Sequence, residues 1–241
     1  MNSSLDNASQ KIMAVWRWLM LAPLGVFVIY VGLRGISESF DNEGFPEALA
    51  IKLELLPIIF PVHMVTGGLA LLLVPLVLYL RGTRWHRLVG RIAAIDILIA
   101  GITAIPVAVV MPVTKVSAAG FVAQGIAWIV LLGFGIWNIR RGRVASHRAC
   151  MLMMAAVTSG ALFFRIYLGL WKAFGVSKYF EAFYALDAWI AWGLPLIGVA
   201  IWLRLFAPHG AATVSLGRSA DAAGSRQVPH AAEPSRHQAG T

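Results

Sequence analysis

The sequence is poor in charged residues and has almost no cysteine. Only 13% of its 241 residues are Asp, Glu, Lys or Arg, about half the share of a soluble domain, whereas 59% are hydrophobic. This composition excludes an ordinary soluble globule. It also excludes disorder over most of the chain, because disordered segments contain few apolar residues. Cys150 is the single cysteine, so the chain cannot form an internal disulfide framework. A polytopic membrane protein remains.

The sequence also lacks the short motifs of common catalytic chemistry. It contains no phosphate-binding loop, no nucleophile elbow and no zinc-protease motif. The formal net charge is +9. In a membrane protein such an excess favours contact with anionic lipid and a fixed orientation, and it does not indicate nucleic-acid binding. Any chemistry is therefore expected from polar residues within the apolar segments.

Long apolar runs dominate the chain and predict an all-α transmembrane bundle of six spans. About 20 apolar residues cross the hydrocarbon core of a bilayer. Runs of about this length cover residues 14–34, 56–80, 90–112, 119–139, 149–170 and 185–206. Residues 1–13 are then a cytoplasmic N-terminus, and 14–206 form the transmembrane domain. Residues 207–241 lack apolar periodicity and predict a disordered cytoplasmic tail.

Two short connections between the predicted spans contain arginine and no acid. Their arginines are Arg81, Arg84, Arg87, Arg91, Arg140, Arg141, Arg143 and Arg148. The connections on the opposite side contain most of the acids. Positive charge close to the ends of spans stays in the cytoplasm. Both arginine-rich connections are therefore predicted to be cytoplasmic, and so are both termini, as six spans require.

The four central spans, residues 56–170, form two hairpins that overlay when the chain is shifted by 61 residues. This shift places His63 on Gln124 and His86 on His147. The number of identities is small, so a duplication and a chance similarity of apolar hairpins both remain open. Equivalent spans run in the same direction, which predicts a four-helix core of two parallel-repeated hairpins.

Three polar residues are predicted to meet in the outer half of the bundle, and we call them the outer cluster. His63, Gln124 and Arg165 lie at similar offsets from the cytoplasmic ends of three different spans. Ionisable groups in hydrocarbon usually face the bundle interior and have a partner. The cluster is either a ligand site for an acidic or carbonyl group or a hydrogen-bonded network that fixes helix register. Arg165 can alternatively extend to the outer headgroups.

Two histidines at the cytoplasmic end are candidate haem ligands. His86 and His147 stand near the starts of two spans at matched positions of the hairpins. Beside them, Arg87, Arg91 and Arg148 are candidate contacts for anions or lipid. Basic and aromatic residues are also common at a membrane interface without any cofactor, and that interpretation stays open. No metal is expected apart from haem iron.

Smaller features concern the interior of the bundle. Asp96, below the cytoplasmic surface, is expected to pair with Arg91 or another arginine. Six glycines in the spans are expected at close helix contacts. They are Gly67, Gly68, Gly101, Gly125, Gly133 and Gly135.

A combination of short motifs resembles the domain of unknown function 2306 family, an uncharacterised family of bacterial membrane proteins. The motifs are His63-x3-Gly67, Trp85-His86-Arg87-x2-Gly90-Arg91, His147-Arg148-x2-Met151 and Arg165-Ile166. The resemblance covers residues 58–205 and implies a multi-pass protein of the bacterial inner membrane. Cys150 and Met153 stand where the family pattern has tryptophan and arginine. The resemblance implies no activity.

The chain is more loosely similar to di-haem membrane cytochromes of the b561 type. That similarity implies haem b held between His86 and His147. It also implies a second, outer pair of histidine ligands, of which only His63 is present, because Gln124 stands at the other position. The expected function is transmembrane electron transfer with a quinone or another redox partner. Two alternatives remain. One is a small-molecule transporter or permease, which the prolines within the spans favour. The other is a non-catalytic structural or assembly protein.

Overall fold

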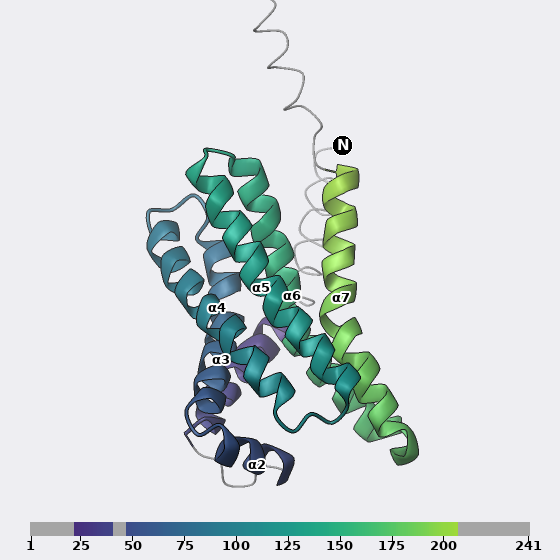
Figure 1. Cartoon of the computed structure of the whole chain (residues 1–241). Coiled ribbons are helices and arrows are strands. Elements are labelled where there is room, and N and C mark those ends of the chain that lie inside the picture. The colour runs from purple at the N-terminus through teal and green to yellow at the C-terminus, as the bar shows by residue number, and fades with distance from the viewer. Residues whose placement is uncertain (1–21, 41–46, 207–241) are drawn as a thin grey trace, which may run out of the picture. The chain divides into compact units, whose positions relative to one another are not determined.

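The computed structural model describes residues 22–40 and 47–206, and all regular secondary structure in these ranges is helical (Figure 1). Residues 22–38 are helical. The elements that follow are α2 (Glu47–Leu55), α3 (Ile59–Tyr79), α4 (His86–Val109), α5 (Lys115–Arg140), α6 (Val144–Phe174), the 3-10 turn η1 (Ser177–Tyr179) and α7 (Phe180–Phe206). The all-α prediction is confirmed.

Five helical segments are long and apolar enough to cross a membrane within the described residues. They are Ile59–Tyr79, His86–Val109, Lys115–Arg140, Val144–Phe174 and Ser177–Leu205. They correspond to the last five of the six predicted runs. The first predicted run, 14–34, lies partly outside the described residues. The predicted terminal segments 1–13 and 207–241 lie wholly outside them.

Helices α3 to α6 form a four-helix ring. Each helix contacts the next along the chain, and α3 also contacts α6, which closes the ring and places α4 diagonally opposite α6 (Figure 1). Each helix contributes two buried residues to the central core. The eight are Ala70, Val74, Ile97, Ala100, Trp128, Leu132, Met154 and Val157. The Trp128 indole N–H donates to the Thr158 hydroxyl at 3.2 Å, which satisfies a polar group inside this core.

Small residues let the helices of the ring approach closely. A Cβ atom at Gly101 in α4 would lie 3.2 Å from the carbonyl oxygen of Gly125 in α5, and one at Gly125 would lie 3.0 Å from the Gly101 oxygen. Gly68 and Gly135 also stand at close contacts, as expected. Gly67 and Gly133 do not, because a Cβ at either would meet nothing within 4 Å.

Two further helical segments cover the ring. The helical residues 22–38 pack against α3 and α6 through an apolar cluster of Val31, Leu71 and Leu162. Helix α7 packs against α5 and α6, where Trp189 Nε1 donates to the Val116 carbonyl at 3.1 Å. Residues up to Ile201 form one compact unit and Trp202 begins a second, so the contacts described here lie within the first.

Candidate functional site

The chain direction distinguishes two ends of the ring. The arginine end comprises the α3–α4 and α5–α6 connections, with the eight arginines of the two basic segments. The α2 end is the opposite one, where α3 and α5 begin and α4 and α6 end. His63 and Arg165 belong to the α2 end, whereas His86 and His147 belong to the arginine end.

His63 is half-buried and connects α3 to α4. Its Nδ1 atom lies 3.2 Å from the carbonyl oxygen of Ala100 and 3.3 Å from the hydroxyl of Thr103. A carbonyl oxygen can only accept a hydrogen bond, so Nδ1 carries the proton of the neutral imidazole. Its Nε2 atom is then the one with a free lone pair. The hydrogen bond to the Ala100 carbonyl of α4 thus fixes the orientation of the His63 ring.

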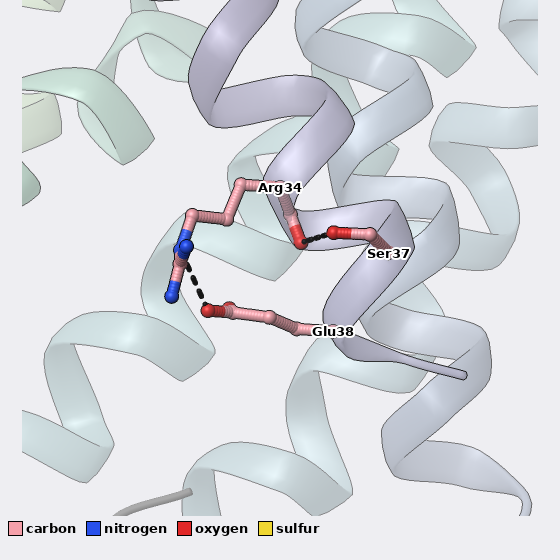
Figure 2. A network of polar contacts seen from close by, with 3 residues as sticks. All are labelled: Arg34, Ser37 and Glu38. Carbon is pink, nitrogen blue, oxygen red and sulfur yellow. Dashed lines mark hydrogen bonds and ion pairs between the residues drawn. The ribbon is translucent and has the colours of Figure 1, made fainter. Parts of the chain in front are cut away.

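Arg165 lies in α6 and folds back along its own helix. Its Nη1 atom donates to the Ala161 carbonyl at 2.9 Å, and the side chain is exposed. The Glu38 carboxylate acts electrostatically on its guanidinium group. Glu38 also forms an ion pair with Arg34, with 2.8 Å between Nε and Oε1 (Figure 2). Glu38 thus pairs directly with Arg34 and acts at longer range on Arg165 of α6.

Lys52 brings a further positive charge from α2. Its Nζ atom donates to the Val107 carbonyl at 2.8 Å, close to the C-terminal end of α4. A cation at a helix C-terminus satisfies a carbonyl that has lost its helical partner. Burial lowers the pKa of Lys52 below the usual lysine value. The charges of Lys52 and Arg165 both act on the His63 imidazole.

Together these residues form what we call the cationic cluster: Arg34, Lys52, His63 and Arg165. Among the described residues, three basic side chains and one imidazole occur here together with the carboxylate of Glu38, which pairs with Arg34 and acts on Arg165. The Arg34 side chain is 60% exposed and that of Glu38 is 32% exposed, so the cluster is open at this edge. Such an arrangement can bind an anion, and an arginine can hold a carboxylate or phosphate by two parallel hydrogen bonds.

The structure places the three residues of the predicted outer cluster unequally. His63 and Arg165 interact electrostatically. Gln124 instead donates from Nε2 to the Val157 carbonyl of α6 at 3.2 Å. Within the described residues no hydrogen bond joins it to His63 or Arg165. Arg34, Glu38 and Lys52 were not expected at the site. The sequence does place Glu38 and Lys52 in the predicted outer connection between the first two runs, which was a signal for these two.

The two histidines at the arginine end make similar contacts. His86 Nδ1 lies 3.1 Å from the Val77 carbonyl near the end of α3, and His147 Nδ1 lies 2.9 Å from the Gly135 carbonyl in α5. Both rings are half-buried, and both leave Nε2 available in the neutral form. The described residues contain no group of three or more His, Cys, Asp or Glu side chains that could hold a metal ion.

The remaining charged candidates lie mostly at the surface of the arginine end. Arg87, Arg91 and Arg148 are exposed. Asp96 is buried, with 6% exposure, and its Oδ2 atom has no hydrogen-bond partner. The expected pairing with Arg91 is wrong, because no ion pair of Asp96 is present in the part of the chain that the structure describes. Asp96 points into the packed ring beside Ile97, whereas Arg91 points outward.

A family model described as "Predicted membrane protein (DUF2306)" matches residues 60–204, which is more than half of the chain. The chain belongs to the DUF2306 family. The match covers α3 to α7 almost completely, so the resemblance seen in the histidine and arginine motifs is confirmed. The DUF2306 region contains His63, Gln124 and Arg165, whereas Arg34, Glu38 and Lys52 precede it. Comparison with curated proteins and with solved structures gave no match.

Proposed function

We propose that this membrane protein binds a small anionic molecule at the cationic cluster, as the binding step of a transporter or permease. The observation that carries the proposal is the excess of positive charge there. Glu38 pairs with Arg34 and acts on Arg165, while Lys52 adds a further positive charge near His63. An anion carrying a carboxylate or phosphate group balances these charges and takes the fork of Arg165. His63 Nε2, which has a free lone pair, can accept a hydrogen bond from a protonated oxygen of the anion, such as that of hydrogen phosphate.

The proposal includes an orientation. Six spans, the first being residues 14–34, place both termini in the cytoplasm and the α2 end outside. The arginines of the α3–α4 and α5–α6 connections support this, because positive charge near span ends stays inside. The exposed Arg87, Arg91 and Arg148 then contact anionic lipid of a bacterial inner membrane. The anion consequently enters the cluster from the external side.

Prolines inside the spans support a bundle that can change shape. Pro75, Pro106 and Pro195 lie within α3, α4 and α7. Each removes one backbone hydrogen bond from its helix and permits a kink. Pro106 lies just beyond Thr103, on the helix that His63 contacts. Movement of α4 at this point would alter the setting of His63 and release the anion.

Ligand-dependent stability tests the proposal directly. The full chain in detergent is heated with inorganic phosphate, with succinate, or with chloride at equal ionic strength. At least one of the two polyvalent anions should raise the unfolding temperature more than chloride does, because a ligand that binds only the folded state stabilises it. Arg165→Leu should abolish the difference, and Arg84→Leu, at the arginine end, should keep it. Equal shifts with all three anions would contradict the proposal.

A second function, haem binding, is favoured by one specific observation. His86 and His147 each bond Nδ1 to a backbone carbonyl of a neighbouring helix, at 3.1 and 2.9 Å. Metal-binding histidines usually make such a bond, which orients Nε2 toward the metal. The two residues lie on α4 and α6, which are diagonal in the ring. Haem b held there would support electron transfer to a quinone or another redox partner. An absorption spectrum of purified protein, before and after reduction, tests this.

A further inference from the structure

Asp187 is an isolated carboxyl group in the interior of the protein. It lies in α7, seven residues after the helix begins, and its side chain is 0% exposed. Neither Oδ1 nor Oδ2 has a hydrogen-bond partner. Burying an ionised carboxylate without a partner costs far more than burying the neutral acid. In a membrane-spanning helix, such a residue marks a functional site more often than a structural one.

Helices α5 and α6 pack closely against α7 in the neighbourhood of Asp187. On one side, a Cβ atom at Gly120 of α5 would lie 2.7 Å from the carbonyl oxygen of Ala188. On another, a Cβ atom at Gly160 of α6 would lie 2.6 Å from the Cβ of Trp192. The backbones of α5 and α6 thus approach α7 closely at Ala188 and Trp192, shortly after Asp187.

Aromatic rings close the junction toward the start of α7. Tyr184, one turn before Asp187, packs against Phe121 of α5 and Phe164 of α6, with centroid distances of 6.1 and 5.3 Å. Phe121 and Phe164 also contact each other at 5.2 Å, edge to face. The three rings thus form an aromatic contact between α5, α6 and α7, one turn before Asp187.

Within the described residues, no positively charged side chain pairs with Asp187. Asp187 acts electrostatically on Tyr184 of the same helix. On α5, the buried polar side chain near the contact is Ser117, and the nearest titratable residue along the helix is the exposed Lys115. On α6, the nearest charged residue along the helix is Arg165, which is exposed and acts with Glu38. In the described residues Asp187 forms no ion pair.

We propose that Asp187 is a proton-binding site at the junction of α5, α6 and α7, neutral at physiological pH and exchanging its proton with solvent. A proton is the one cation that needs no space and no second ligand. This site is separate from the cationic cluster and does not depend on the binding of an anion there. It gives the bundle a group that can take up a proton in one state and release it in another, which proton-coupled membrane proteins require.

Infrared spectroscopy of the full chain tests this assignment. The variant Asp96→Asn serves as background, so that the second buried carboxyl group does not contribute. At neutral pH, the carbonyl stretch of a protonated carboxyl group should be present in this background and lost in Asp96→Asn/Asp187→Asn. Replacement of the exposed Glu181 on the same helix by Gln should leave the band unchanged. An identical band with and without Asp187 would overturn the proposal.

Two further measurements separate a working proton site from a sealed acid or a hidden ion pair. Transfer into D2O should shift the band of Asp187, because a site that loads and releases protons exchanges with solvent. A band that never shifts would overturn the exchange. Asp187→Asn should keep the unfolding temperature unchanged or raise it, since asparagine resembles the neutral acid. A clear loss of stability would instead indicate an ionised carboxylate with a partner.

Discussion

The Glu38 carboxylate lies 2.8 Å from the Nε atom of Arg34 (Figure 2). It also acts on the guanidinium group of Arg165 in α6. Among the described residues it is the carboxylate that acts on both arginines. If an anion binds at the cationic cluster as proposed, Glu38 would compete with it for these arginines.

Removal of this competition should strengthen anion binding. Glu38→Gln should lower the dissociation constant for the effective anion about two- to fivefold, in line with the small energies of exposed ion pairs. Isothermal titration at low salt measures the change. Glu54→Gln, an exposed acid on α2, is the matched control and should have a smaller effect. Weaker binding in Glu38→Gln would show that Glu38 organises the site instead of competing with the ligand.

The pH dependence of binding should reveal Lys52. Because burial lowers its pKa, Lys52 loses its charge at a lower pH than an exposed lysine does. Anion affinity should therefore fall as the pH rises, and this fall should begin at a lower pH than the one at which an exposed lysine titrates. In the same window the unfolded chain still holds the proton that the folded chain has lost, so folding stability should rise with pH. In Lys52→Met both pH-dependent changes should disappear, as titration and thermal unfolding would show.

The helical residues 22–38 should depend on one glycine for their position. A Cβ atom at Gly68 would lie 2.6 Å from the carbonyl oxygen of Gly32. Gly68→Ala should therefore push this segment away from α3 and destabilise the protein by about 1–3 kcal/mol. Gly67→Ala, whose Cβ meets nothing within 4 Å, is the neighbouring control. Equal unfolding temperatures for the two variants would contradict this packing.

The proposed orientation can be tested by labelling cysteines in whole cells. In a Cys150→Ala background, Ser146→Cys at the arginine end should resist an impermeant thiol reagent. Ser39→Cys, just after the N-terminal helical segment, should react readily. The physical reason is the cytoplasmic retention of the arginine-rich connections. The opposite labelling pattern would place the cationic cluster on the cytoplasmic side.

If haem binds at the arginine end, His86 and His147 should act as a unit. Replacing either with alanine should remove most of the low-spin absorbance, and replacing both should add little, because one axial ligand cannot maintain a six-coordinate iron. His63→Ala should leave this absorbance unchanged, since His63 lies at the other end. Full absorbance in both single variants, or none in the unaltered protein, would leave His86 and His147 as hydrogen-bonding residues at the interface.

The sequence predicted the spans well but the partners of their polar residues poorly. Apolar runs of about 20 residues are a local property, so five spans follow from composition alone. The direction in which a side chain points depends on helix rotation, which residue spacing does not specify. Asp96 illustrates this, because its sequence neighbourhood offered Arg91 while the fold turned the two residues apart. Gly67 and Gly68 are adjacent in the sequence, yet only Gly68 lies against the helical residues 22–38.

By itself, the sequence determined an all-α membrane protein, its family and the height of His63 and Arg165 along their helices. Hydropathy acts residue by residue, and helical rise converts sequence distance into height. Only the tertiary structure decided that Arg34, Glu38 and Lys52 join His63 and Arg165, and that Gln124 bonds to α6 instead. These contacts arise from close packing of segments far apart in the chain. Such packing is a property of complementary surfaces in three dimensions, which no local pattern encodes.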